Sequence, residues 1–250
     1  MNIFVDGYGI VAHSIVRKIL ENHSVDPKNL LINTYHTEGN TAFLNYLKDL
    51  QIKHFNLPYN KLAKKVSLFK PDYFLSLYGR RIIPRSILNL VKFRSINLHP
   101  SLLPEYKGCF SCPWVIIKRE KFTGITIHDI IEEVDAGEIL YQEKVAISPD
   151  ETAFSLYHRL AGKFIACFDD FFSDLLKGRI ISHPMPKGGS YYPRRVPYDG
   201  MIDETWSEGQ TEAFIRSMEF PPFRGAILKK GNSTIEISSY AQFQKIVDSR

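Results

Sequence analysis

Residues 2–20 read NIFVDGYGIVAHSIVRKIL, and this stretch sets the fold of the chain. It begins with a short apolar run, Asn2–Asp6, which has the length of a buried strand. The glycine turn Gly7-Tyr8-Gly9 follows, and apolar residues then recur at helical spacing over Ile10–Leu20. A strand, a tight turn and a helix in this order open a βαβ unit, so we expect a parallel sheet at the N-terminus.

The same alternation continues through the first hundred residues. Short apolar runs predict further strands at Leu30–Thr34, His54–Leu57, Tyr73–Tyr78 and Ser95–His99. Helical patterns separate them at Thr41–Leu50 and Leu62–Phe69. Right-handed crossovers between such strands give a mostly parallel, Rossmann-like α/β sheet, in which ligands bind beyond the carboxyl ends of the strands.

The second half of the chain changes character. A possible helix within Gly108–Glu120 precedes two expected strands, at Thr123–Ile130 and Glu138–Ile147, and Thr152 opens a long amphipathic helix that ends at Gly178. A Pro-, Gly-, Tyr- and Arg-rich segment follows, and beyond it we expect a helix at Gln210–Ser217 and strands at Gly225–Lys229 and Ser233–Ser239. We therefore predict a catalytic domain over residues 1–185 and a small C-terminal α+β subdomain over residues 186–250.

Composition favours an ordinary soluble chain of 250 residues, with 44% hydrophobic and 24% charged residues. The net charge of +5 is too small to require a nucleic-acid partner, because phosphate binding needs clustered charge. Three cysteines give no disulfide framework, no basic leader precedes the first apolar run, and no stretch is long enough to span a membrane. We expect a cytoplasmic protein with neither a membrane nor a nucleic acid as partner.

The segment from Ser95 to Gly108, SINLHPSLLPEYKG, is the most informative for chemistry. If Ser95–His99 is a strand, Asn97 and His99 project to the same face at its carboxyl end. An amide beside an imidazole can stabilise an oxyanion and move a proton. The spacing alone is equally compatible with a buried polar pair that satisfies local backbone groups.

A second segment, GITIHDIIEEVDAG over residues 124–137, places Asp135 in a turn. Gly137 is expected to provide a positive φ angle there. A carboxylate in this turn can orient His99, as the acidic member of a catalytic triad orients its histidine. Taken alone, Asp-Ala-Gly is a common turn, and we expect only a local role for His128.

Together, the two segments closely resemble the signature of the folate-dependent formyltransferases. The resemblance rests on Asn97-Leu-His-Pro-Ser-Leu-Leu-Pro104 followed by Val134-Asp-Ala-Gly137. It implies that Asn97, His99 and Asp135 are the catalytic residues and that 10-formyltetrahydrofolate donates a formyl group to a primary amine. It also implies that two stretches contact the folate: Leu77, Tyr78, Gly79 and Arg80, and Ile131, Glu132, Glu133 and Val134.

The branch of the family that the chain resembles most acts on nucleotide-linked amino sugars. The compact tail is similar to that of enzymes for dTDP-4-amino-4,6-dideoxyglucose, which implies a place in bacterial surface-polysaccharide (O-antigen) synthesis. Methionyl-tRNA formyltransferases have a larger, basic C-terminal barrel, whereas only some 60 residues follow position 190 here. A tRNA-binding enzyme remains the alternative within the family.

A nucleotide diphosphate needs cations and flat apolar walls. The substrate contacts we predict are Gly7, Tyr8, Gly9, Lys107, Trp114, Tyr191, Arg194 and Phe220; further candidates are Arg80, Arg81, Arg195, Arg224, Tyr192, Trp206 and Phe223. Aromatic residues next to prolines are more often packed at the boundary of a subdomain, and arginine pairs are often solvated. Exposed aromatic residues in the tail would be poorly covered in a monomer, so we also expect a homodimer.

The glycine turn at residues 7–9 also suggests a second class, a nicotinamide oxidoreductase. The third glycine of that motif is replaced by Ala12, and no acidic residue follows the second strand, at Tyr35-His36. Cys109 and Cys112 have the spacing of a zinc or redox motif, but no second pair exists, so we predict structural cysteines and no metal.

Overall fold

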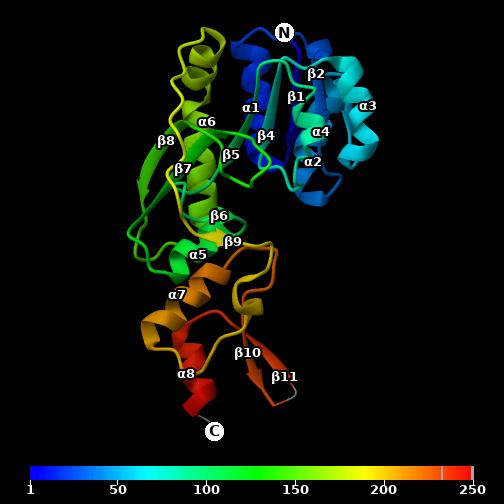
Figure 1. Cartoon of the computed structure of the whole chain (residues 1–250). Helices are drawn as coiled ribbons and strands as arrows, with labels where there is room; N and C mark the ends of the chain where they lie inside the picture. Colours follow the sequence, from blue (N-terminus) through cyan, green and yellow to red (C-terminus); the bar gives the residue numbers. More distant parts are fainter. Residues whose placement is uncertain (232, 249–250) are drawn as a thin grey trace. The chain divides into compact units, whose positions relative to one another are not determined.

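The computed structural model describes residues 1–231 and 233–248 of the chain (Figure 1). These residues form two compact units. The first unit contains Met1–His99, Ile125–Gln142 and Ala161–Lys187; the second contains Pro100–Gly124, Glu143–Leu160 and the described part of Gly188–Arg250. The predicted division at residue 185 into a catalytic domain and an accessory subdomain stays a prediction.

A seven-stranded sheet organises the fold, in the order β3-β2-β1-β4-β5-β7-β8. Its strands are β1 (Ile3–Gly7), β2 (Leu30–Asn33), β3 (His54–Phe55), β4 (Tyr73–Leu77), β5 (Arg94–His99), β7 (Phe122–Asp129) and β8 (Ile139–Ala146). The first five strands pair in parallel, and β7 pairs antiparallel to β5. The predicted mostly parallel α/β sheet is confirmed, and each predicted strand edge lies within two residues of the observed one.

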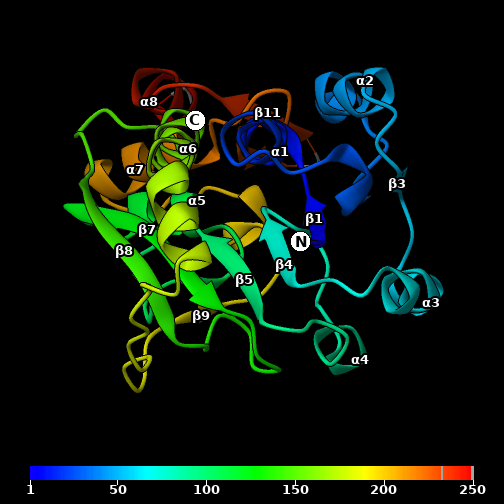
Figure 2. The ribbon, with the colours of Figure 1, turned by 90° about the horizontal axis from the view of Figure 1, so that it is seen from above.

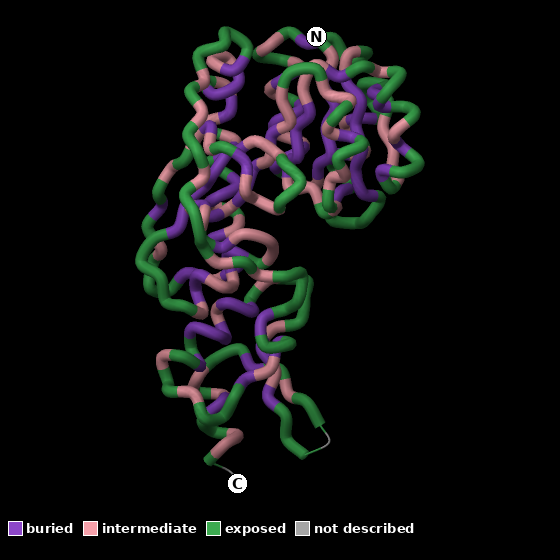
Figure 3. The backbone as a smooth tube through the Cα atoms, in the orientation of Figure 1, coloured by how far each residue is buried: buried purple, intermediate pink, exposed green. Residues whose placement is uncertain are grey.

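Helices cover both faces of the sheet in the first unit (Figure 2). One face is covered by α1 (Gly9–Asn22), α2 (Thr41–Asp49) and the part of α6 (Ala153–Leu176) that belongs to this unit; the other by α3 (Tyr59–Phe69) and α4 (Arg85–Leu88). Every residue of β1 and β2 is buried, and Figure 3 shows this buried centre of the sheet. Apolar residues of α3 and α4 pack on Phe4 and Phe74, whose rings stack at 4.6 Å between centroids. The helices therefore hold the strands rigidly and leave the strand ends as the positions for function.

The second unit has a hydrophobic core of its own. The elements of this unit include β6 (Lys107–Gly108), α5 (Ser111–Ile117), β9 (Tyr191–Tyr192), α7 (Glu208–Met218), β10 (Ala226–Lys230), β11 (Ser233–Ile237) and α8 (Tyr240–Asp248). Phe214 and Met218 of α7 pack with Leu228 of β10, Ile237 of β11 and Phe243 of α8. The β10–β11 hairpin and α7 were predicted, whereas α8 and the short β6–β9 pair were not.

Three short 3₁₀ helices complete the described secondary structure, at Pro27–Asn29, Glu38–Asn40 and Pro197–Gly200. None of the helices in the described residues combines the length and the apolar character that crossing a membrane requires.

Candidate active site

Three side chains from distant parts of the chain meet beside the carboxyl end of β5. The alternation of strand side chains puts Asn97 and His99 on one face, as the sequence predicts. The loop between β7 and β8 brings Asp135 to them, so that its Oδ2 lies 3.3 Å from His99 Nδ1. Asn97 donates from Nδ2 to the other oxygen, Oδ1, at 3.3 Å. The sequence-predicted group is therefore brought together by the fold.

The loop that carries Asp135 is closed at its base. The backbone N–H of Asp129 donates to the carbonyl of Glu138 at 2.9 Å, and the N–H of Ile130 donates to the carbonyl of Ser95 at 2.8 Å. Asp135 itself takes a φ angle of 51°, in the left-handed region. Glycine, asparagine and aspartate adopt this conformation more readily than other residues, so an aspartate suits this position of the turn.

Gly137 has a different role from the one the sequence predicts. Asp135, and not Gly137, has the positive φ angle in this turn. A Cβ atom on Gly137 would lie 1.9 Å from the backbone oxygen of Asp129. Gly137 is needed because two backbone segments touch at the base of the loop, where no side chain fits.

A second histidine belongs to the same group. His128 of β7 is paired with Asn97 across the antiparallel strands. Its Nε2 lies 3.1 Å from Asn97 Nδ2 and 3.4 Å from Asp135 Oδ1, and its side chain is 2% exposed. The sequence prediction of a merely local role missed this position, since nothing in the sequence gives the register between β5 and β7.

The two stretches predicted to contact folate differ in their surroundings. The carbonyl of Leu77 accepts from the N–H of Tyr8 at 3.0 Å, and the N–H of Arg80 donates to Tyr35 Oη at 2.6 Å. Ile131 is 47% exposed, and Glu132 and Glu133 are exposed as well. The loop after β7 therefore presents side chains outward, whereas two backbone groups after β4 are used within the protein.

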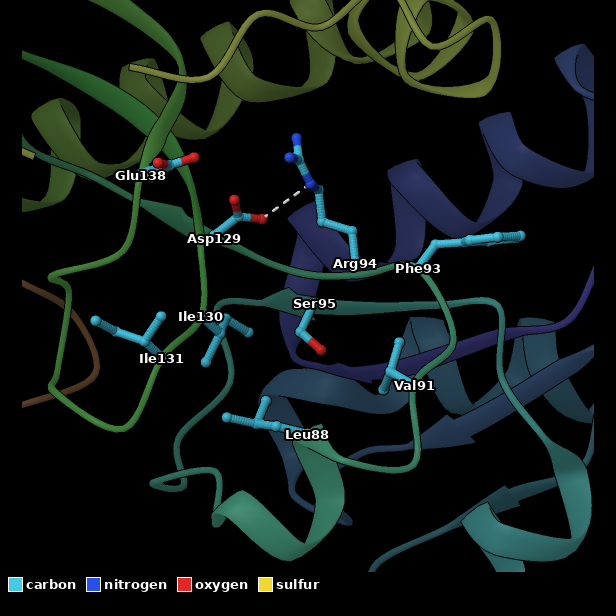
Figure 4. Close-up of a pocket in the computed structure, with 9 residues that line it drawn as sticks. All are labelled: Leu88, Val91, Phe93, Arg94, Ser95, Asp129, Ile130, Ile131 and Glu138. Atoms are coloured by element: carbon cyan, nitrogen blue, oxygen red, sulfur yellow. Dashed lines mark ion pairs between the residues drawn. The ribbon is translucent and has the colours of Figure 1, made fainter. Parts of the chain in front are cut away.

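A cavity of about 410 Å³ lies along β5 and is lined by Ile131 (Figure 4). Its apolar walls are Leu88, Val91, Ile130 and Ile131, and Ser95 contributes a hydroxyl. Arg94, Asp129 and Glu138 line it as well, and Arg94 Nε lies 3.2 Å from Asp129 Oδ1. Burial, with Glu138 nearby, raises the pKa of Asp129 despite the neighbouring Arg94. The cavity therefore combines an apolar wall with a polar and charged one, and both kinds of group can contact a heteroaromatic ring.

The predicted glycine turn after β1 lies next to the arginine after β4. The Arg80 guanidinium stacks over the Tyr8 ring, 4.6 Å from its centre. Gly9 begins α1 with a φ angle of 65°, and its N–H donates to Asn40 Oδ1 at 2.9 Å. A Cβ on Gly7 would lie 2.7 Å from that of Ala12, so Gly7 also permits the close packing of helix and strand. This packing explains Gly7 without a nicotinamide nucleotide.

The other predicted substrate contacts lie in the second unit. Lys107 pairs with Tyr191 across β6 and β9, and Trp114 stacks on Tyr192 at 4.5 Å between ring centres. Arg194 is exposed in the segment that follows β9. Phe220 belongs to another aromatic group, with Phe154, Tyr157 and Phe223. Within this unit, Lys107 therefore lies beside Tyr191, whereas Trp114 and Phe220 belong to separate aromatic groups.

The cysteine and metal predictions concern the same unit. Burial raises the pKa of the Cys112 thiol to about 12, which makes it a poor nucleophile at neutral pH. Within the described residues, no three His, Cys, Asp or Glu side chains are grouped so that they could hold a metal ion.

Comparison with known proteins identifies the family of the chain. The model of the formyl transferase family matches residues 31–165, more than half of the chain. GDP-perosamine N-formyltransferase of Brucella melitensis is 35% identical over 230 residues, which cover 91% of this chain and 88% of the relative. The bifunctional polymyxin resistance protein ArnA of Wigglesworthia glossinidia brevipalpis is 34% identical over 187 residues, or 72% of this chain and 29% of the relative.

Solved structures agree with the fold. A 4-N formyltransferase from Francisella tularensis superposes with a TM-score of 0.78 at 22% identity, over 95% of this chain and 96% of its own. An N-formyltransferase from Helicobacter canadensis, in complex with folinic acid and dTDP-3-aminofucose, gives 0.79 at 21% identity, over 95% and 86%. The chain belongs to the formyl transferase family, in the branch of the sugar N-formyltransferases. The predicted family is thereby confirmed, in place of the alternative class, a nicotinamide oxidoreductase.

Proposed function

We propose that the protein transfers the formyl group of 10-formyltetrahydrofolate to the amine of a nucleotide-linked amino sugar, with Asn97, His99 and Asp135 as catalytic residues. The observation that carries this proposal is the contact of Asp135 with both His99 and Asn97, at 3.3 Å each. An amide, an imidazole and a carboxylate in contact have the functions that acyl transfer to an amine requires.

Each of the three residues has a distinct task in this reaction. The new bond joins the amine nitrogen to the formyl carbon, and the bond from that carbon to the folate nitrogen breaks. Asn97 donates an N–H to the formyl oxygen, where negative charge develops. With Nδ1 of His99 directed at Asp135, Nε2 takes the proton that the amine loses and passes it to the departing nitrogen. Asp135 stabilises the imidazolium that exists between these two transfers.

The cavity along β5 fits the ring of the folate donor. Leu88, Val91, Ile130 and Ile131 supply an apolar wall, and the side chains of Ser95, Asp129 and Glu138 supply polar groups for a heteroaromatic ring. Ser95 and Asn97 lie on the same face, two residues or roughly 7 Å apart along the strand. One methylene separates the ring system of the donor from the nitrogen that carries the formyl group. A ring beside Ser95 therefore brings the formyl group to Asn97.

The diphosphate of the sugar nucleotide is proposed to bind near the turn after β1. The Arg80 guanidinium lies there, 4.6 Å from the centre of the Tyr8 ring, and a guanidinium binds phosphate oxygens well. The N–H groups of Tyr8 and Gly9 already donate to the Leu77 carbonyl and to Asn40 Oδ1, so Arg80 is the proposed phosphate ligand, and Gly7, Tyr8 and Gly9 stay as predicted contacts beside it. Lys107, Trp114, Tyr191, Arg194 and Phe220 stay as predicted contacts for the rest of the substrate.

The identity of the nucleotide has two candidates. The tail of the chain favours dTDP-4-amino-4,6-dideoxyglucose, whereas the Brucella relative, similar over 91% of this chain, acts on GDP-perosamine by its name. In either case the product is a formylated sugar for a bacterial surface polysaccharide. The homodimer and the cytoplasmic location predicted from the sequence are part of this proposal.

The direct test is a transfer assay with 10-formyltetrahydrofolate and a panel of dTDP- and GDP-linked amino sugars. We expect one of them to gain the mass of a single formyl group, only when both donor and enzyme are present. Absence of transfer to every sugar of the panel, with saturable binding of NAD(P)H instead, would contradict the proposal.

A separate assay tests the folate cavity. Ile131→Ala removes apolar contact from its wall, so we expect the KM for the donor to rise about tenfold while the KM for the amino sugar is unchanged. Leu68→Ala is the matched control, because Leu68 is 74% exposed on α3 and does not line the cavity. Equal behaviour of the two variants would place the ring elsewhere.

A further inference from the structure

His128 is a buried histidine whose neighbours determine where its hydrogen lies. It is 2% exposed and makes contacts at both ring nitrogens. Nδ1 lies 2.7 Å from the backbone oxygen of Asp129. A carbonyl oxygen only accepts, so Nδ1 must be the donor, and in the neutral ring Nε2 is then an acceptor.

The acceptor nitrogen of His128 faces the amide of Asn97. Nε2 lies 3.1 Å from Asn97 Nδ2, so the amide nitrogen donates to it. Rotating the amide by half a turn would put its oxygen beside the lone pair of Nε2 and beside the Asp135 carboxylate, which are both acceptors. The two neighbours therefore permit only one orientation of the Asn97 amide.

This arrangement also allows one amide hydrogen to remain available to the substrate. Asn97 Nδ2, His128 Nε2 and Asp135 Oδ1 are 3.1, 3.3 and 3.4 Å apart, a nearly equilateral triangle. Seen from Nδ2, the two acceptors lie on one side and are separated by about 60°, half the angle of ~120° between the hydrogens of an sp² amide nitrogen. A hydrogen that lies between the two acceptors is only about 30° from the direction of each, so one hydrogen can serve both and leave the other to point away from them.

We propose that His128 is a positioning residue, which fixes the Asn97 amide so that its second N–H donates to the formyl oxygen. This inference rests on the proposed role of Asn97 in transfer. His128 acts only through Asn97 and Asp135 and touches neither substrate. A pair of β-strands therefore supplies the orientation, because β7 sets His128 opposite Asn97 and the carbonyl of the next residue, Asp129, fixes the tautomer.

Two substitutions test the contacts of the two ring nitrogens separately. His128→Gln keeps a polar group near the position of Nε2, where its amide oxygen can accept from Asn97. His128→Asn keeps one only near Nδ1, where it can still bond the carbonyl of Asp129. We expect kcat to fall about tenfold or more for His128→Asn and only a few fold for His128→Gln, with both KM values nearly unchanged.

The matched controls are His183→Gln and His183→Asn, since His183 is exposed and its contact with Ile139 is made by the backbone. A purely structural histidine predicts the reverse order, with His128→Asn as the more active variant, because it preserves the bond to the backbone. Equal activity of the two His128 variants would likewise overturn the inference.

A double-mutant cycle separates this inference from the proposed function. In an Asn97→Ala background, measured at high enzyme concentration, His128→Asn should cause little further loss, because its effect passes through Asn97. Additive losses would overturn the role of His128 and leave that of Asn97 intact. Wild-type activity of Asn97→Ala alone would instead overturn the proposed function, and this inference with it.

A spectroscopic test uses the unmodified protein and does not depend on the folding of any variant. ¹⁵N NMR of the histidine rings distinguishes the two neutral tautomers. We expect His128, assigned by comparison with His128→Gln, to carry its hydrogen on Nδ1. A hydrogen on Nε2 in the neutral ring would overturn the proposal.

Discussion

Two carboxylates of the first unit, Asp6 and Asp135, provide an instructive comparison. Asp6 lies in β1 and is fully buried; its Oδ2 accepts from Tyr59 Oη at 2.5 Å and from Asn33 Nδ2 at 3.2 Å. Asp135 lies in a loop, and its side chain is 9% exposed. Both are held by hydrogen bonds among buried groups, so burial alone does not distinguish a site from a structural network.

The two carboxylates differ in the groups that they contact. Burial and the neighbouring Asp6 raise the pKa of Tyr59 far above its usual range, so this phenol keeps its hydrogen at neutral pH. Asp135 instead contacts the imidazole of His99, the proposed proton acceptor, at 3.3 Å, and that of His128 at 3.4 Å. A carboxylate beside a proton acceptor can orient it for proton transfer, whereas Asp6, held by a phenol and an amide with the Arg81 guanidinium 3.8 Å away, stabilises the fold.

The largest expected effect comes from breaking the Asp135 group. His99→Ala and Asp135→Asn should each reduce kcat about 10²- to 10⁴-fold, since they remove the proton acceptor or the charge that orients it. Single-turnover transfer measures the loss, and circular dichroism checks that the fold is retained. A His99→Ala variant with wild-type turnover would remove the proposed base.

Asp6→Asn is the matched substitution on the other side of the comparison. An asparagine oxygen can still accept from Tyr59 and Asn33, so we expect kcat to stay within a few fold of the wild type. A loss of activity as large as that of Asp135→Asn would show that the two carboxylates do not differ as argued here.

An intermediate effect is expected from the loop that carries Asp135. Gly137→Ala places a Cβ 1.9 Å from the Asp129 oxygen, so the base of the loop must shift; we expect a loss of about 1–3 kcal/mol in unfolding free energy, together with reduced turnover. Urea unfolding and the transfer assay measure the two effects.

Gly162→Ala provides the control for that substitution. Gly162 lies within α6, and a Cβ there meets nothing within 4 Å. Alanine in a helix interior should stabilise the protein by about 0.5–1 kcal/mol and leave turnover unchanged. A Gly137→Ala variant that behaved in the same way would mean that the contact with Asp129 does not constrain the loop.

The smallest expected effect is a pH dependence of stability that Asp6 causes. Burial raises the pKa of Asp6 above its ordinary value of 3.8, so ionisation costs more in the folded than in the unfolded protein. The stability of the wild type relative to Asp6→Asn is therefore greatest below about pH 4 and declines as the pH rises through the folded pKa. Urea unfolding of both proteins from about pH 4 to 8 measures this difference, and a constant difference would contradict the assignment.

Much of this fold was predictable because its signals are local. Gly7 separates a buried strand from a helix, and the period of the apolar residues gives α6 almost from end to end. The face shared by Asn97 and His99 follows from strand alternation alone. The missed helix α8 begins at Tyr240, directly after the β10–β11 hairpin, and only Phe243 is buried among its residues. Tyr240, Phe243, Ile246 and Val247 nevertheless recur at helical spacing and pack on the core of this unit, so the signal for α8 was present in the sequence but confined to nine residues.

The parts of the site that escaped prediction depend on contacts between distant segments. His128 lies opposite Asn97 only because β7 pairs with β5 in one particular register. Gly137 is required by the nearby Asp129 oxygen, a contact that no turn propensity reveals. The exposed tail aromatics from which a homodimer was inferred are partly covered by their own chain, since Trp206 packs on Phe214 at 5.0 Å between ring centres.

The closed base of the loop after β7 separates two kinds of sequence change. The Asp129–Glu138 hydrogen bond and the Gly137 contact hold the two ends of the loop together, so inserting or deleting a single residue would displace the Asp135 carboxylate. Glu132 and Glu133 lie at the exposed tip and take no part in these contacts. We therefore expect the length of the loop to determine the position of Asp135, and the side chains at its tip to affect only the contacts with the folate donor.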